Sequence, residues 1–382
     1  MKSVTLLQYS DMIHFEALPK KNTILRISEL KPRLTEFIKK DLKIADSVLY
    51  EEFNDIIENK KIFPEDKGSP YFKITTEPKF VKVYKYKTFK SKRDKNYVKV
   101  GSYFGDYYAV NFEKVQIKIY SRIKRLEELV EKALKSFLII NNLGQRQSKG
   151  FGSFVVDGTT KEEFEKILKN YFKIILKKSS NDSLKTVNQD YQLIKSGINF
   201  KEYKKSLLYR YFAKDNIIWE KKKIKQEIIK KHPKIWEKIK HGSKHIPRNE
   251  DKDVEYRFIR ALLGLSYRYD FIKKQEYQDR KNKLNSISVE VNSKNKIERI
   301  PSPILFKVYK NDIYLVANEV EAIIFDKDFE FKLLDKYVKN NRIMEDEYEL
   351  FDLTTPSSFD LFAFIKFAYE EELQELNWQR IK

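Results

Sequence analysis

The sequence of 382 residues contains no cysteine and only four histidines. The lack of cysteine excludes disulfide bonds, thiolate zinc sites and a cysteine nucleophile, and the scarcity of histidine argues against a histidine-rich metal site. No apolar run approaches the roughly 18–20 residues that a membrane-spanning helix needs, and the first residues are too polar for a signal peptide. We therefore expect a cytoplasmic protein that needs no metal or other cofactor.

Motifs of several enzyme classes are also missing. The chain has no Gly-x-x-x-x-Gly-Lys-Ser/Thr phosphate loop, no Rossmann glycine pattern and no His-Glu-x-x-His. It has no Gly-x-Ser-x-Gly either, and its carboxylates form no cluster compact enough for a two-metal site. These absences disfavour nucleotide-driven and hydride-transfer enzymes.

Basic residues, in contrast, are abundant. The chain has 77 Lys and Arg against 56 Asp and Glu, a formal net charge of +21. Such an excess favours a polyanionic partner, with nucleic acid ahead of a membrane. A general bias of composition towards lysine is the alternative, but it does not explain why the lysines cluster.

Hydrophobic periodicity in the first half predicts an α+β fold. Its elements follow the order strand, helix, strand, strand, helix, strand, which is the split βαβ order of a ferredoxin-like, or RRM-like, βαββαβ domain. The clearest of them are the strand at Val4–Gln8, the strand within Tyr107–Tyr120, the helix at about Arg122–Leu138 and the strand at Phe151–Val156.

Three of the ten glycines lie between the second helix and the last strand of this order, in Leu143–Phe154. Glycine allows positive φ angles and close approach to a ligand. The loop also carries Arg146 and Lys149, and such side chains beside exposed N–H groups suit a phosphate. The alternative is a helix end followed by a bend into a strand.

The element Gly144-Gln145-Arg146-Gln147-Ser148-Lys149-Gly150-Phe151-Gly152, at this place in the fold, resembles the RAMP superfamily of CRISPR-associated proteins. The early basic helix is similar as well. The resemblance implies that the protein holds CRISPR RNA, or another structured or single-stranded RNA, together with other protein subunits in an effector or defence complex. The RNA-contacting residues that it implies are Gly144, Arg146, Lys149, Gly150, Gly152, Arg26, Lys31 and Arg33.

A second basic candidate is the strand-like run Lys79–Lys87, which mixes lysine with aromatic and β-branched residues. Lys82, Tyr84 and Lys85 could offer cations to phosphates and a ring to a base. An edge strand protected by lysine against aggregation is an equally good interpretation.

We expect three domains from the remaining pattern. Residues 1–157 form the ferredoxin-like domain, residues 158–250 a helical and strongly basic insertion, and residues 251–382 a second α+β domain of degenerate ferredoxin-like type. Residues 201–250 contain sixteen Lys and Arg against six Asp and Glu, which suits a grip on a phosphate backbone or a solvated helical face. Residues 341–382 have a net charge of −6 and end in an acidic helix.

Histidine suggests an alternative function, because imidazole titrates near neutral pH and serves as an acid or base. His14, His241 and His245 are candidates for a metal-independent endoribonuclease that processes repeat RNA, as is His232. None of them lies at a position of the RAMP pattern, and surface histidines are common.

Further periodic segments predict the remaining elements. We expect helices at Thr160–Lys177, Val254–Leu265 and Ser358–Leu376, a linker at Lys178–Ser196, a hairpin at Ile304–Val316 and a strand at Ala322–Phe325.

Overall fold

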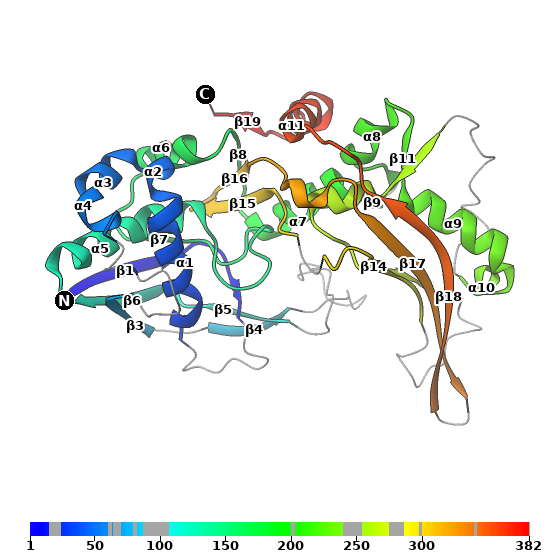
Figure 1. Cartoon of the computed structure of the whole chain (residues 1–382), viewed down its shortest axis with the longest axis horizontal. Helices are drawn as coiled ribbons and strands as arrows, with labels where there is room; N and C mark the ends of the chain where they lie inside the picture. The colour runs from blue at the N-terminus through cyan, green and yellow to red at the C-terminus, as the bar shows by residue number, and fades with distance from the viewer. Residues whose placement is uncertain are drawn as a thin grey trace. The chain divides into compact units, whose positions relative to one another are not determined.

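The computed structural model describes residues 1–14, 24–59, 63, 70–78, 82–86, 107–199, 203–239, 254–274, 286–297, 300–339 and 342–381. These residues form helices and mainly antiparallel sheets in two compact units (Figure 1), which confirms the α+β class. Unit 1 comprises Met1–Tyr191, Ile304–Asn318 and Leu373–Lys382, and unit 2 comprises Gln192–Pro303 and Glu319–Glu372.

This division differs from the three domains expected from the sequence. The sequence pattern predicts the hairpin Ile304–Val316 within the last domain, whereas unit 1 contains it as β15 and β16. Local periodicity identifies a hairpin but carries no information about the sheet that it joins. Here the hairpin extends a sheet that begins with β8, which lies more than a hundred residues earlier in the chain.

The first sheet of unit 1 has the spatial order β3-β6-β1-β7, and each neighbouring pair is antiparallel. Helices α1 and α5 connect β1 to β3 and β6 to β7, so the chain follows strand, helix, strand, strand, helix, strand through this sheet. The bounds are β1 (Lys2–Gln8), α1 (Ile27–Lys40), β3 (Phe72–Pro78), β6 (Lys114–Ser121), α5 (Lys124–Ile140) and β7 (Phe154–Val156).

Helix α5 packs one apolar face on this sheet. Leu126, Val130, Leu134 and Phe137 recur every three or four residues, as a helix with one buried face requires, and all four side chains are buried. On β6, Val115, Ile117 and Ile119 alternate with more exposed residues and are also buried. The periods read from the sequence therefore identify the core correctly in both elements.

Two further sheets complete unit 1. The strands β2, β5 and β4 form one of them, and the other has the order β15-β16-β8-β19. The remaining elements have these bounds: β2 (Met12–Ile13), α2 (Leu42–Ala45), α3 (Ser47–Glu52), α4 (Asn54–Ile57), β4 (Lys82–Tyr86), β5 (Tyr107–Asn111), α6 (Lys161–Tyr171), β8 (Ile174–Ser179), β15 (Ile304–Tyr309), β16 (Asp312–Ala317) and β19 (Gln379–Arg380).

The segment after β7 differs from the prediction. The helix expected at Thr160–Lys177 ends at Tyr171, and residues from Ile174 form strand β8 instead. The β-branched pair at its start pairs with β16, so tertiary pairing overrides the helical spacing. The segment expected to be a linker contains helix α7 (Ser183–Lys195).

Unit 2 is built on a sheet whose spatial order, β13-β14-β17-β18, follows the chain, unlike a split βαβ unit. Figure 1 shows β17 and β18 running side by side as a long hairpin. The elements are β9 (Ile198–Asn199), β10 (Tyr203–Lys204), α8 (Leu207–Ala213), β11 (Ile217–Trp219), α9 (Glu220–Lys231), α10 (Pro233–Lys238), β12 (Glu255–Arg257), η2 (Ile259–Leu263), β13 (Arg268–Phe271), β14 (Ile287–Ser293), η4 (Ala322–Ile324), β17 (Asp328–Lys339), β18 (Arg342–Thr354), α11 (Leu361–Ala368) and η5 (Tyr369–Leu373).

Three predictions in this half are wrong in detail. Val254–Leu265 is not one helix, because its first residues pair in parallel with β11 and only the next five form a 3-10 helix. Ala322–Phe325 is a 3-10 turn rather than a strand. The last helix is shorter than expected and passes into a π-helical turn at Tyr369.

Part of the negative charge of residues 341–382 lies on strand β18. Glu345 and Glu347 form ion pairs with Lys336 and Lys332 of β17, at 2.6 and 2.8 Å. Cross-strand pairs of opposite charge stabilise such a ladder, so part of the negative charge is balanced within the hairpin.

Candidate nucleic-acid interface

The glycine-rich loop, Leu143–Phe154, leaves the end of α5 and enters β7 in unit 1. Its ends are bonded together, since the Leu143 N–H donates to the Gly152 carbonyl at 2.9 Å. Gly152 has a φ of +71°, and a Cβ built on it would lie 1.8 Å from the Leu143 oxygen. The close approach of the two strands of the loop therefore requires glycine at this position.

The glycine N–H groups of the loop bond to the protein itself. Gly144 donates to the Glu29 carboxylate of α1 at 2.8 Å, Gly150 to the Gln147 carbonyl at 3.1 Å and Gly152 to the Asp11 carbonyl at 2.9 Å. The Glu29 carboxylate thus already accepts the hydrogen bond of the Gly144 N–H. The RAMP resemblance implies that Gly144 contacts RNA.

Glu29 connects α1 to the loop through several donors. Besides the Gly144 N–H, its Oε1 accepts from Gln147 Nε2 at 3.1 Å and from Arg33 Nη1 at 3.2 Å. Sequence reasoning missed this role, because a glutamate in the first turn of a helix is common and needs no partner in a distant loop.

Strand β15 supports the loop from another direction. The Phe306 N–H donates to the Ser148 carbonyl at 3.1 Å, and Asn142 Nδ2 donates to the carbonyls of Gln147 and Phe306 at 2.7 and 2.8 Å. The loop is therefore held by α1, by the segment around β2 and by β15, and its shape is set before any ligand arrives.

Two cations lie against the start of this loop and have internal partners. Lys307 is fully buried, and its ammonium donates to the Asn141 carbonyl at 2.6 Å and to Asn142 Oδ1 at 3.0 Å. Burial, and then the charge of Arg33, hold the pKa of Lys307 well below its usual value. Arg33 donates to Asn141 Oδ1 and to the Asn142 carbonyl, both at 3.0 Å, so both cations serve the end of α5.

Arg146 and Lys149 carry the remaining charge of the loop. Arg146 has a φ of +55°, in the left-handed region that side-chain-bearing residues rarely adopt. Lys149 is half-buried, with its ammonium 5.1 Å from the centre of the Tyr191 ring. Burial, followed by the charge of Arg146, lowers the pKa of Lys149 to about 8.

The other predicted RNA contacts are spread over unit 1. Arg26 is exposed just before α1. Lys31 is half-buried, with its ammonium 5.3 Å from the Phe72 ring, and burial and then Lys73 lower its pKa. Lys82 of β4 is exposed and forms an ion pair with Glu113, whereas the side chains of Tyr84 and Lys85 lie outside the described residues.

Comparison with known proteins identifies the family of this chain. The family model for the Cmr1 N-terminal domain matches residues 1–198, and the model for the Cmr1 C-terminal domain matches residues 203–381. The chain belongs to the Cmr1 family. It is therefore a CRISPR-associated RAMP protein, a subunit of a multisubunit complex, and the resemblance read from the glycine-rich loop is confirmed.

Among solved structures, the apo form of Cmr1 from Pyrococcus furiosus matches with 12% sequence identity and a TM-score of 0.38. The match covers 84% of this chain and 88% of that chain. No curated protein matches the sequence.

The histidines of this Cmr1-family chain do not form an acid–base site within the described residues. His14 is buried, and its Nε2 lies 3.0 Å from the Ile24 carbonyl. His232 immediately precedes α10 and lies beside the Tyr348 ring, and burial, followed by the charge of Lys231, lowers its pKa. His241 and His245 lie outside the described residues.

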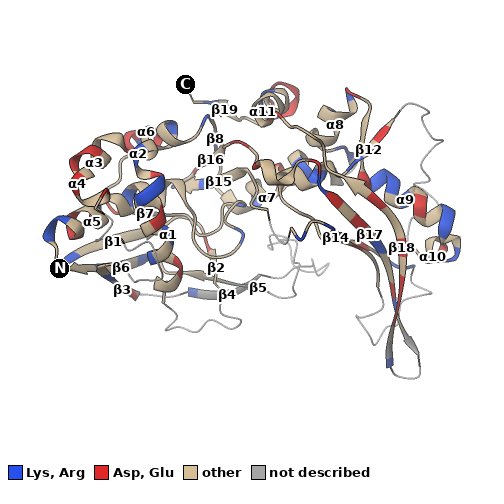
Figure 2. Ribbon diagram, viewed as in Figure 1, with Lys and Arg blue, Asp and Glu red and all other residues tan. Residues whose placement is uncertain are grey.

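The basic helices of unit 2 are only partly solvated. Figure 2 shows Lys and Arg along α9 and α10. On α9, however, Lys223 and Lys231 both pair with Glu227, at 3.5 and 3.3 Å, and the Lys221 ammonium donates to the Ser196 carbonyl at 2.8 Å. Several lysines of this region thus stabilise unit 2.

Two other kinds of site are absent from the described part of the chain. It contains no group of three or more His, Cys, Asp or Glu side chains that could hold a metal ion. No helix there is both long and apolar enough to cross a membrane.

Proposed function

We propose that this protein binds RNA in a CRISPR effector complex, and that Arg146 and Lys149 contact the phosphate backbone. The observation that carries the proposal is the strained, anchored loop that presents them. A residue with a side chain in the left-handed region costs of order 1–3 kcal/mol, and such strain gathers at functional sites. Arg146 keeps this conformation on a loop that three parts of unit 1 hold in place.

The chemistry of the two side chains fits a phosphate backbone. Guanidinium and ammonium groups form charge-assisted hydrogen bonds with phosphate oxygens. Since the glycine N–H groups donate to Glu29, Gln147 and Asp11, the proposal assigns the phosphate contacts to these two side chains. The net charge of +21 adds long-range attraction for a polyanion.

The double variant Arg146→Ala/Lys149→Ala should bind single-stranded RNA at least about tenfold more weakly, because the loss of even one charge-assisted hydrogen bond of roughly 1.5 kcal/mol lowers the affinity by about that factor. The slope of log affinity against log salt concentration should fall in magnitude by about 1.4, since each phosphate contact on a single strand contributes about 0.7. Fluorescence anisotropy of labelled RNA at several salt concentrations measures both quantities.

The matched control removes two exposed charges from other elements of unit 1. Lys40→Ala/Lys166→Ala changes the net charge equally, and both lysines are exposed. If the control weakened binding as much as the loop variant, the loop would have no particular role and general attraction would explain the affinity.

RNA affinity should also depend on pH through Lys149. Its pKa of about 8 in the free protein means that the ammonium is charged below this pH and neutral above it. Binding to a phosphate requires the charged form, so the affinity should fall as the pH rises from 7 to 9, by up to about tenfold for the part due to Lys149. Lys149→Arg should remove this dependence and keep the affinity at pH 9, because arginine stays charged. An unchanged pH profile in Lys149→Arg would exclude Lys149 from the contact.

A further inference from the structure

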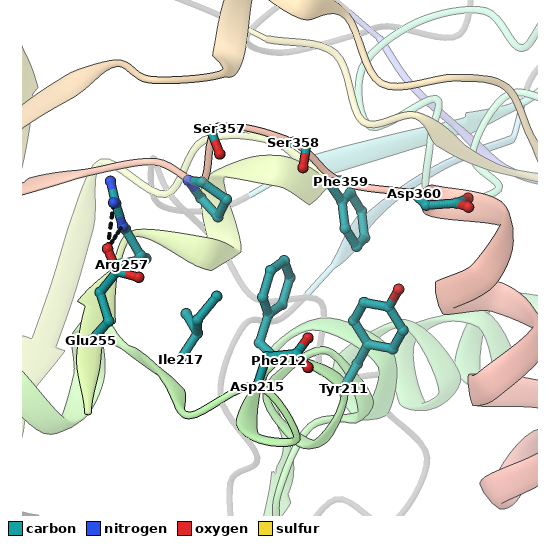
Figure 3. Close-up of a pocket in the computed structure, with 11 residues that line it drawn as sticks. Tyr211, Phe212, Asp215, Ile217, Glu255, Arg257, Ser357, Ser358, Phe359 and Asp360 are labelled. Carbon is teal, nitrogen blue, oxygen red and sulfur yellow. Dashed lines mark hydrogen bonds and ion pairs between the residues drawn. The ribbon is translucent and has the colours of Figure 1, made fainter. Parts of the chain in front are cut away.

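Unit 2 contains a pocket whose chemistry differs from that of the basic loop. It has a volume of about 300 Å³ and lies between α8, the strands β11 and β12, and the segment that precedes α11. Pockets that bind small molecules range over roughly 300–1,000 Å³, so this one suits a single side chain or another small group. Figure 3 shows the side chains that line it.

Three aromatic rings form one wall of the pocket. Phe212 and Phe359 are stacked, with ring centres 5.5 Å apart and planes 27° apart. Tyr211 meets both rings edge to face, at 5.6 Å from Phe212 and 6.2 Å from Phe359. Phe359 and Tyr211 are half-buried, so their rings remain partly accessible to a ligand.

The charged residues of the lining are mainly acidic. The lining contains three carboxylates, those of Asp215, Glu255 and Asp360, and one cation, Arg257. The Arg257 guanidinium is already engaged, since its Nε donates to Glu255 at 2.5 Å. Asp360 uses one oxygen to cap α11, where it accepts from the N–H groups of Phe362 and Ala363. Asp215 is exposed and provides the negative charge that a ligand would meet.

The state of Tyr211 agrees with this charge distribution. Burial raises the pKa of Tyr211, and the charges of Asp360 and Asp215 raise it further. The ammonium of the neighbouring Lys214 lies 4.2 Å from the centre of the Phe367 ring. Neither Lys214 nor Phe367 belongs to the lining of the pocket. The lining thus has a formal net charge of −2, from three carboxylates and one guanidinium, in a chain whose net charge is +21.

We propose that this pocket binds the guanidinium of an arginine side chain from another protein subunit. A planar cation stacks on aromatic faces and pairs with a carboxylate at the same time. An ammonium can pair with Asp215 but stacks less well, and a phosphate or nucleotide would be repelled by the carboxylates. The inference goes beyond RNA binding and uses a different unit of the protein.

The test uses the full chain and a defined probe, N-acetyl-arginine methylamide. Its binding is followed by NMR of protein labelled with ¹³C in the phenylalanine rings, with the Phe359 signal assigned by its loss in Phe359→Leu. We expect a saturable shift of the Phe359 signal, and none with the uncharged analogue N-acetyl-norleucine methylamide. Asp215→Asn should weaken binding of the arginine probe about two- to fivefold, as expected for loss of one partly exposed ion pair.

The control variant is Glu321→Gln, an exposed carboxylate of unit 2 outside the pocket, which should leave the affinity for the probe unchanged. RNA affinity should be unchanged in Asp215→Asn, which separates this result from the test of the loop. An equal response to the norleucine analogue, no weakening in Asp215→Asn, or tighter binding of AMP than of the arginine probe would each overturn the proposal. The last result would assign the pocket to a nucleobase.

Discussion

Gly152→Ala should destabilise unit 1 by about 4 kcal/mol or more, which lies among the largest effects of single substitutions. The new Cβ would stand 1.8 Å from the Leu143 oxygen and 2.8 Å from the Leu143 carbonyl carbon. Both neighbours are backbone atoms, so a side-chain rotation cannot relieve the overlap. The loop would have to open, and the hydrogen bonds from Leu143 to Gly152 and from Gly152 to Asp11 would be lost.

Gly158→Ala provides the matched control. Gly158 also has a positive φ, +81°, but a Cβ built on it would meet nothing within 4 Å. Its replacement should therefore cost only the left-handed conformation, about 1–2 kcal/mol. Calorimetry of both variants measures the difference. Equal stabilities for the two variants would show that the loop rearranges at little cost and is not rigid.

Arg260→Met should destabilise unit 2 by about 3–5 kcal/mol, because it leaves a buried carboxylate without its cation. Glu220 is fully buried, and its Oε1 accepts from the Arg260 guanidinium and from the Tyr269 hydroxyl, the latter at 2.9 Å. The Arg260 guanidinium also lies 4.3 Å from the centre of the Tyr269 ring. The substitution removes the Arg260 guanidinium and leaves the buried Glu220 carboxylate without this cation.

The double variant Glu220→Leu/Arg260→Met distinguishes a lost ion pair from poor packing. With both charges absent, no carboxylate is stranded, and replacement of a buried pair by apolar residues is often neutral. We expect the double variant to recover most of the stability that Arg260→Met loses. Urea unfolding followed by tryptophan fluorescence is suitable, since Trp219 and Trp236 are two of the three tryptophans and both lie in unit 2. If the double variant were less stable than the single one, packing rather than charge would dominate at this site.

Elements that depend on local patterns could be predicted well. The 3.6-residue period of α5 and the alternation in β6 result from one-sided burial, which leaves a direct record in the order of residues. The position of the glycine-rich loop between α5 and β7 could also be predicted, because three glycines separate two segments with regular hydrophobic periods. Predictions failed where pairing with a distant segment determines the secondary structure. In β8, pairing with β16 makes a strand of residues whose spacing is helical.

The role of each charge in the loop could not be predicted in this way. Arg33 and Arg146 carry the same guanidinium, yet Arg33 is bonded to the end of α5 while Arg146 is presented by a strained turn. Lys307 lies more than 150 residues from the asparagines that it contacts. No local rule connects such positions, because their proximity arises only when β15 packs against the loop.

Composition and local order were enough to predict a basic α+β protein with one glycine-rich loop. These properties depend on net charge, periodicity and glycine spacing, all of which are present in the unfolded chain. The tertiary structure alone shows which groups of the loop already have partners within the protein. The N–H groups of Gly144 and Gly152 are bonded to Glu29 and Asp11, and the burial of Lys307 against Asn141 and Asn142 gives it a structural role. Both effects depend on distances between residues that are far apart in the sequence, and only folding sets those distances.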